Sequence, residues 1–349
     1  MPPETKNPPP VGAGEGEMQS DSAKRLNRYG TARSVTNALL ATITDDELRA
    51  AGVAKPERIR HCGEWLRFRH YYRVDQHKLS AGNFCDKPLI CGLCAILRGS
   101  RLLAAYLARL QLVQVIEPRL RPIMVTLSVR NGDDLTERLA HLRSSLKTLH
   151  ARRHRPNQPS VMHDIAGGVF SVEVVNTGNG WHPHAHAIWL VDEAHEAFTS
   201  SRQWSLQKLS AEWHAITGDS FIVDARPITP APDENGQNPY AAGFCEVFKY
   251  AVKPAELGRD RLLEAFPILT GQRLVGAFGC FYGIKEPTKL TDDLDGLKSQ
   301  PFFEYFYRFM QGHYCVAQEP VHHEASHPVS DCQAQPRVNG TAIRTARPA

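Results

Sequence analysis

Hydrophobic positions recur along the central part of the chain with two periods, which predict a succession of helices and strands. One helical stripe lies in residues 95–116 and consists of Leu97, Leu102, Leu103, Tyr106 and Leu110. A second lies in residues 133–153, where Asp133 and Asp134 precede Leu135, Leu139, Leu142, Leu146 and Leu149 as N-terminal signals. Helical patterns also cover 204–216 and 241–253. Strand patterns occupy 121–130, 167–175, 181–192 and 220–228.

The predicted order is strand, helix, strand, strand, helix, strand, helix. It favours an α+β fold in which helices flank a central antiparallel or mixed sheet, rather than a doubly wound parallel one. The two consecutive strands are separated by the short polar sequence NTGNG at 176–180, which predicts a β-hairpin. The residues of these two strands are therefore expected to face one another.

The two ends of the chain differ from its centre. Residues 1–30 and 317–349 are rich in Pro, Gly, Ser and Glu and are expected to be disordered. The N-terminus lacks the pattern of a signal peptide, and no apolar run of about 18 residues is present, so a cytoplasmic location without membrane contact is expected. The formal net charge is +4, and the arginines between 98 and 155 suit either contact with a polyanion or a solvated helix face.

Histidines cluster in the strand GWHPHAHAIWLVD. Because side chains alternate along a strand, His184 and His186 share one face, whereas Pro183 sets His182 apart at the strand entrance. Glu173, on the preceding strand, can lie beside this pair if the hairpin forms. Two imidazoles and a carboxylate leave open positions on a divalent ion, as a catalytic metal requires. The alternative is a pair of histidines that hydrogen-bond to the backbone at a strand end.

The segment CEVFKYAVK combines charged residues with a tyrosine. On a helix, Glu246 and Tyr250 lie one turn apart on one face, and Lys249 and Lys253 form a second such pair. A tyrosine that attacks a phosphodiester benefits from nearby cations, and a carboxylate one turn away can activate a second nucleophile. Alternatively, Tyr250 belongs to a core stripe and the charges to a solvated face.

Four cysteines lie in the first third of the chain, in the segment 55–115. Cys91 and Cys94 form a C-x-x-C pair, and Cys62 and Cys85 precede it. In a reducing compartment, four thiolates suit a closed structural Zn²⁺ site, and no thioredoxin-like pattern favours a redox role. Packing or tail positions are expected for the other cysteines, which are Cys245, Cys280, Cys315 and Cys332.

Taken together, these motifs resemble the replication initiator (Rep) family of rolling-circle plasmids, within the HUH endonuclease superfamily. HPHAHAIWL resembles the family's metal motif, VFKYAVK its nucleophile motif, and MVTLSV its upstream strand motif. The resemblance extends from about Cys62 to Gly283. It implies an HUH endonuclease domain at 116–290 and a front segment that binds zinc, and we expect a helical extension at 291–316.

The resemblance also implies roles for individual residues. His184 and His186 would bind a divalent ion, Mg²⁺ or Mn²⁺, with Glu173 as an inferred third ligand. Tyr250 would attack origin DNA, giving a 5′-phosphotyrosyl link and a 3′-hydroxyl primer. Where related transposases and phage initiators carry a second tyrosine, this chain has Glu246, which implies that the reaction ends by hydrolysis. Plasmid origin DNA, as a single strand or hairpin, is the expected partner, together with a host helicase and polymerase.

Other functions are compatible with parts of this pattern. An HUH-type transposase or mobilisation protein would share the motifs, although the order of histidines before tyrosine favours a Rep protein over a relaxase. A metallohydrolase of small substrates could use the histidine pair without Tyr250. A DNA-binding regulator could keep the zinc segment without nicking DNA.

Overall fold

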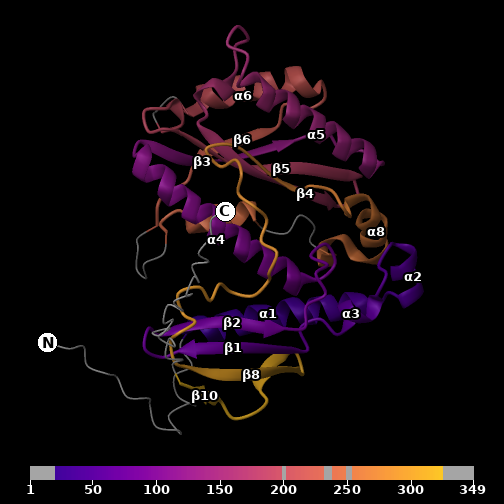
Figure 1. Ribbon diagram of the computed structural model, residues 1–349. Helices are drawn as coiled ribbons and strands as arrows, with labels where there is room; N and C mark the ends of the chain where they lie inside the picture. Colours follow the sequence, from indigo (N-terminus) through magenta and orange to yellow (C-terminus); the bar gives the residue numbers. More distant parts are fainter. Residues whose placement is uncertain (1–19, 199–201, 232–237, 249–253, 325–349) are drawn as a thin grey trace, which may run out of the picture.

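Two five-stranded antiparallel sheets and the helices around them make up the fold. The structure is a computed structural model that describes residues 20–198, 202–231, 238–248 and 254–324 (Figure 1). The two sheets lie at opposite ends of the molecule, and the long helix α4 (Gly92–Ile116) lies between them (Figure 1). The architecture confirms the predicted α+β class with antiparallel sheets and flanking helices.

The sheet that contains the histidine-rich strand, which we call the histidine sheet, has the strand order β6-β3-β5-β4-β7. Its strands are β3 (Leu120–Ser128), β4 (Gly167–Asn176), β5 (Trp181–Asp192), β6 (Val223–Pro227) and β7 (Val275–Gly279). The predicted hairpin is β4–β5, and its connection contains Gly178 and Gly180 with φ of 99° and 86°. These left-handed backbone angles favour glycine, which explains why the tight turn forms at this point of the sequence.

Helices cover both faces of the histidine sheet (Figure 1). On one face, α5 (Leu135–Arg152) and α6 (Arg202–Thr217) bury residues such as Ala185 and Trp189 of β5. On the other face, α4 and α7 (Ala241–Val247) pack against Ile188 and Leu190. Asp134 caps α5 by accepting hydrogen bonds from the backbone N–H groups of Thr136 and Glu137, as the predicted N-terminal signal requires.

The second sheet joins strands from both ends of the chain. Its order is β10-β8-β1-β2, and β9 pairs with the free part of the β8 edge. The strands are β1 (Trp65–Tyr71), β2 (Gln76–Gly82), β8 (Phe302–Met310), β9 (His313–Val316) and β10 (Val321–His323). Helix α1 (Ser20–Leu40) contributes Leu26 and Tyr29 to the core on one side of this sheet. The first and last parts of the described chain are thus one structural unit.

The remaining elements connect these layers. Two short helices, α2 (Asp45–Ala50) and α3 (Pro56–Arg60), precede β1, and α8 (Pro254–Leu269) precedes β7. Two short 3₁₀ helices flank the β4–β5 hairpin: η1 (Val161–Asp164) precedes β4, and η2 (Glu196–Phe198) follows β5. No helix among the described residues is both long and apolar enough to cross a membrane.

The structure corrects three expectations about the flanking segments. Residues 20–30, expected to be disordered, form the first half of α1, because Leu26 and Tyr29 bury their side chains in the core. The helical extension expected at 291–316 is wrong: residues 302–310 and 313–316 are the strands β8 and β9. Their aromatic side chains suit a sheet surface better than a helix. Residues 321–323, in the expected tail, form β10, whereas 1–19 and 325–349 lie outside the described residues.

Candidate active site

Strand register brings the predicted metal ligands to one face of the histidine sheet. In the β4–β5 pair, Glu173 lies opposite His184, and Ser171 lies opposite His186. Directly opposite residues in neighbouring strands project to the same face, so the carboxylate and both imidazoles meet there. The predicted proximity of Glu173 to the histidine pair is therefore present in the structure.

The three side chains converge on one point. Glu173 Oε2 lies 3.2 Å from His184 Nε2 and 3.0 Å from His186 Nε2. The two Nε2 atoms are 3.1 Å apart. The exposed fractions of the side chains are only 10% for Glu173, 13% for His184 and 25% for His186, so the cluster opens to solvent mainly beside His186.

These distances fit the first coordination shell of a divalent cation. Two ligand atoms that each lie about 2.1 Å from an ion, with an angle of about 90° between them, are about 3.0 Å apart. The donor set of two imidazole nitrogens and one carboxylate oxygen is compatible with Mn²⁺, Mg²⁺ or Zn²⁺, and three protein ligands leave positions for water or a phosphate oxygen. Glu173, His184 and His186 are thus a group that could hold a catalytic metal.

Neighbouring polar groups orient both histidines. Thr126 of β3 lies opposite His186, and its Oγ1 is 3.2 Å from His186 Nδ1. His184 Nδ1 lies 3.3 Å from the carbonyl oxygen of His182, a position from which Nδ1–H donates. Contacts of this kind at Nδ1 leave Nε2 to face the shared centre. Thr126 was not predicted, although the alternation in MVTLSV, with Thr126 and Ser128 on one face, carries a signal for it.

His182 stays at the margin of this cluster. Its ring centroid is 5.4 Å from that of His184, and the three-residue group does not include it. Burial and the neighbouring His184 lower the pKa of His182, which favours its neutral form. His182 thus lies at the strand entrance, apart from the point where the other two imidazoles meet Glu173.

Helix α7 ends against the same face of the sheet. Phe244 and Val247 are buried with Ile188, and the Ser171 hydroxyl donates to the carbonyl oxygen of Val247. Because Ser171 lies opposite His186, the C-terminal end of α7 is anchored beside the histidine cluster. Glu246 belongs to this last turn. The other residues predicted on this helix, Lys249, Tyr250 and Lys253, lie outside the described residues.

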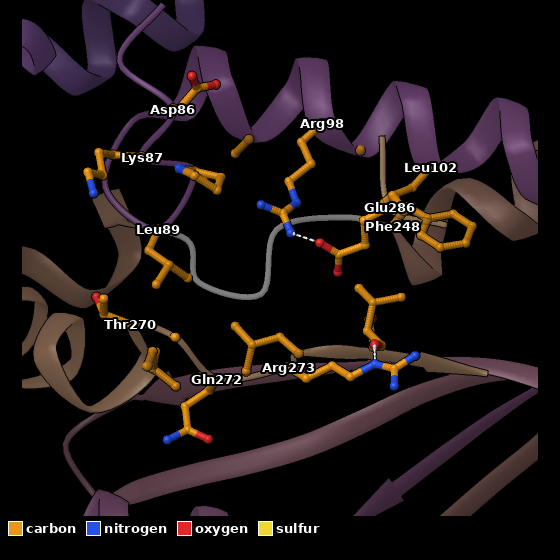
Figure 2. A pocket seen from close by; sticks show the side chains of 18 of the residues that line it. Asp86, Lys87, Leu89, Arg98, Leu102, Phe248, Thr270, Gln272, Arg273 and Glu286 are labelled. Carbon is orange, nitrogen blue, oxygen red and sulfur yellow. Dashed lines mark hydrogen bonds and ion pairs between the residues drawn. The ribbon is translucent and has the colours of Figure 1, made fainter. Parts of the chain in front are cut away.

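A cavity of about 620 Å³ opens next to this anchor. Ser171 and Phe248 line it together with residues of the loop before α4, of helix α4 itself and of the segment after α8, and Figure 2 shows most of these side chains. Arg98 projects into it from α4 and forms an ion pair with Glu286, while Arg273 lies across from them (Figure 2). The cavity therefore combines cations with apolar walls and reaches a residue that adjoins the histidine cluster.

The four predicted cysteines form a second buried cluster. Cys62 lies before β1, Cys85 after β2, and Cys91 and Cys94 at the start of α4. The Sγ atoms of Cys62 and Cys85 are each 3.5 Å from Cys94 Sγ, and Cys91 Sγ is 3.6 Å from Cys62 Sγ. Thiolates at about 2.3 Å from a tetrahedral zinc are about 3.8 Å apart, so this group could bind zinc.

The environment of the cysteine cluster suits a cation. The contact with Cys85 lowers the pKa of Cys62, but contacts with Cys91 and Cys94 and burial outweigh it and raise this pKa. Contacts with the other thiols and burial raise the pKa of Cys85, whereas contacts with the other thiols lower the pKa of Cys91, because the thiols share one negative charge more easily than several. The Cys85 backbone N–H also donates to Cys62 Sγ. Cys245, Cys280 and Cys315 are half-buried and lie apart from this group, and Cys332 lies outside the described residues.

Comparison with known proteins supports the resemblance seen in the sequence. Residues 76–300, more than half of the chain, match the family described as replication protein, Rep_1. No curated protein and no solved structure matches the chain. The matched region contains the histidine sheet with Glu173 and the histidine pair, as well as α7. The chain belongs to the Rep_1 family of replication proteins, which supports its assignment as a plasmid replication initiator.

Proposed function

We propose that this protein starts rolling-circle replication of a plasmid by nicking one strand of the origin. The observation that carries the proposal is the convergence of Glu173, His184 and His186, within 3.2 Å of one another, on the sheet face against which α7 ends. A metal centre beside the helix that leads to a tyrosine is the arrangement that phosphodiester transesterification requires.

In this mechanism the protein supplies the metal ligands and the nucleophile. Glu173, His184 and His186 would hold a Mg²⁺ or Mn²⁺ ion, which when bound would polarise the scissile phosphate. The Tyr250 hydroxyl oxygen bonds to the phosphorus, and the bond from phosphorus to the 3′ oxygen breaks. The proton lost by the tyrosine is balanced by one taken up by the departing 3′ oxygen. The products are a 5′-phosphotyrosyl link and a free 3′-hydroxyl that primes synthesis.

Glu246 would end the reaction. Its backbone lies in the last turn of α7, and Ser171 fixes the carbonyl group of the next residue, Val247. After one round of strand displacement, Glu246 takes a proton from water, and the resulting hydroxide attacks the phosphorus at the regenerated origin. The bond from this phosphorus to the 3′ oxygen breaks, and the departing 3′ oxygen takes up a proton to become a 3′-hydroxyl. Hydrolysis leaves a free DNA end instead of a second covalent link. Lys249 and Lys253 would compensate charge on the phosphate and favour ionisation of Tyr250.

The cavity beside Ser171 would hold the DNA strand next to the nick. Its basic residues, Arg98 and Arg273, suit a phosphate backbone, and its apolar wall at Phe248 suits a base. Because Ser171 both lines the cavity and lies opposite His186, a strand in the cavity would continue to the metal centre. A single or extruded strand is the expected substrate, and structural zinc on Cys62, Cys85, Cys91 and Cys94 would fix the cavity wall before α4.

Incubation with supercoiled origin plasmid and Mn²⁺ or Mg²⁺ tests the proposal. The protein is expected to produce open circles and a covalent protein–DNA adduct at a 5′ end. Tyr250→Phe is expected to lose both, and Tyr282→Phe, a change at an exposed tyrosine in the matched region, is expected to keep both. An undiminished adduct from Tyr250→Phe would contradict the assignment of the nucleophile. Sequence-specific binding without any nick would indicate a regulator instead.

A further inference from the structure

The second sheet has one face in the hydrophobic core and one face outside it. Leu66, Phe68 and Tyr307 point to the core side and are at most 3% exposed. The residues that alternate with them project to the opposite side and belong to neither buried core cluster. We call this side the aromatic–arginine face; it is formed by Trp65, Arg67, Arg69, Phe302, Phe306 and Arg308.

Strand pairing gathers these residues into a continuous surface. Trp65 lies opposite Arg308, and Arg67 lies opposite Phe306. The rings of Trp65 and Phe306 are stacked, with centroids 5.7 Å apart and planes inclined by 21°. The face thus presents two nearly parallel aromatic rings from neighbouring strands.

Arginines lie directly against two aromatic rings of this face, those of Trp65 and Phe302. The Arg67 guanidinium carbon is 5.9 Å from the centroid of Trp65, and that of Arg69 is 4.5 Å from the centroid of Phe302. Glu304, between them, lies 3.6 Å from Arg67 Nε and 3.3 Å from Arg69 Nε. This single carboxylate holds both guanidinium groups in place beside the aromatic rings.

The face carries an excess of positive charge. Lys78, which lies opposite Arg69 on β2, adds a fourth cation to Arg67, Arg69 and Arg308. Four cations against the carboxylate of Glu304 leave a formal charge of +3 (4 − 1). The side chains of Arg67 and Arg69 are 41% and 31% exposed, so their charges reach solvent.

We infer that the aromatic–arginine face binds single-stranded DNA. Flat aromatic rings on a sheet provide stacking surfaces for bases, and guanidinium groups between them contact phosphates and stack in turn. Paired bases in a duplex are stacked on each other, so their faces are not free to bind such rings. The excess of cations favours a polyanion over an apolar partner.

This second surface deepens the proposed function, because an initiator that nicks an origin works on DNA that has become single-stranded. Strands β1 and β8, which carry the rings and the three arginines of the face, lie outside residues 76–300, the part that matches the family. The face lies at the opposite end of the molecule from the histidine sheet (Figure 1). Single-stranded DNA bound here would be held apart from the strand at the nicking site.

Fluorescence anisotropy with a labelled 20-nucleotide single strand of mixed sequence tests the inference. The full chain is used with EDTA, so that binding does not depend on metal or nicking. Trp65→Ala is expected to weaken binding at least about fivefold through loss of stacking. Arg67→Gln combined with Arg69→Gln, a milder change that keeps polar contacts to Glu304, is expected to weaken binding and to lower the salt dependence of the affinity.

Controls separate this inference from the nicking proposal. Arg49→Ala, a change at an exposed arginine of α2, is expected to leave the affinity unchanged, and circular dichroism verifies that each variant is folded. His184→Ala is expected to abolish nicking while it keeps single-strand binding. If folded Trp65 and arginine variants bind the single strand within twofold of the parent, the inference is wrong. It is equally wrong if they lose affinity for duplex DNA to the same extent, or if they instead change the oligomeric state in sedimentation.

Discussion

Glu173 Oε2 lies 3.0 Å from His186 Nε2, although the two residues occupy different strands and are not directly opposite one another. Glu173 lies directly opposite His184, and its carboxylate also contacts His186, the next residue of β5 on the same face. Such convergence of three donors on one point, on a mostly buried sheet face, is the strongest structural reason to expect a divalent ion there.

Glu173→Gln tests the carboxylate as a metal ligand. The amide is nearly isosteric but carries no charge, so we expect the affinity for Mn²⁺ to fall by at least about tenfold and nicking to fall with it. Isothermal titration calorimetry measures the first effect, and a nicking assay at saturating Mn²⁺ measures the second. His154→Gln, a change at an exposed histidine, serves as the control. Unchanged Mn²⁺ affinity in Glu173→Gln would place the ion elsewhere.

Thr126→Val tests the group behind His186. Valine keeps the shape of threonine but removes the hydroxyl, whose Oγ1 lies 3.2 Å from His186 Nδ1. Loss of such an orienting contact is expected to weaken metal binding by about 10- to 100-fold without removing any ligand. Titration with Mn²⁺ followed by nicking rate measures the effect, and excess Mn²⁺ should restore much of the rate. A variant that cannot be rescued by metal would indicate a different role for Thr126.

The hairpin and its ligands could be predicted because their signals are local. Strand periodicity assigns His184 and His186 to one face, and the short glycine-containing turn brings Glu173 back beside them. The second sheet could not be predicted in this way. Its β1 pairs with β8, so that Trp65 lies opposite Arg308, and no local pattern reports a contact across more than 200 residues of sequence. For the same reason, the sequence of residues 302–310 alone predicts part of a helical extension, and only the pairing with β1 identifies a strand.

Metal analysis tests the cysteine cluster. We expect about one zinc ion per chain, bound more tightly than any ion at the histidine centre, because four thiolates form a closed site. Cys91→Ser is expected to lose this zinc and to lower the melting temperature, since Cys62 and Cys94 would be left without a complete site in the core. Inductively coupled plasma mass spectrometry and thermal denaturation measure the two effects. Cys315→Ser, outside the cluster, is expected to change neither. If the parent protein contained no zinc after purification and Cys91→Ser melted at the same temperature as the parent, this assignment would be contradicted.

Arg273→Ala tests whether the cavity beside Ser171 receives DNA. Arg273 lines the cavity and is not among the proposed ligands or nucleophiles. We expect KM for an oligonucleotide that spans the nick to rise about 3- to 30-fold with a smaller change in kcat, because a phosphate contact made before the reaction is lost. Steady-state nicking of a single-stranded oligonucleotide separates the two constants. Arg49→Ala, a change at an exposed arginine of α2 that does not line the cavity, should leave KM unchanged, and an equal effect of both changes would argue against a local contact.

The half-buried His150 makes the stability of the protein depend on pH. Its ring packs against Phe170 and Phe278, and burial lowers its pKa from 6.5 to about 4. The unfolded chain therefore takes up a proton below about pH 6.5, whereas the folded chain stays neutral at this position until about pH 4. The contribution of His150 is complete above pH 6.5, declines as the pH falls, and levels off below about pH 4. It amounts to at most about 3 kcal/mol.

Urea denaturation between pH 4 and pH 7.5 checks this dependence. In His150→Leu the free energy of unfolding should fall less steeply between pH 6.5 and pH 4 than in the parent, because the group that takes up the proton in the unfolded state is gone. The exposed His154 provides the comparison, and His154→Leu should keep the slope of the parent. Parallel curves for the parent and His150→Leu would show that His150 is protonated equally in both states, and the acid sensitivity would then have to come from other groups.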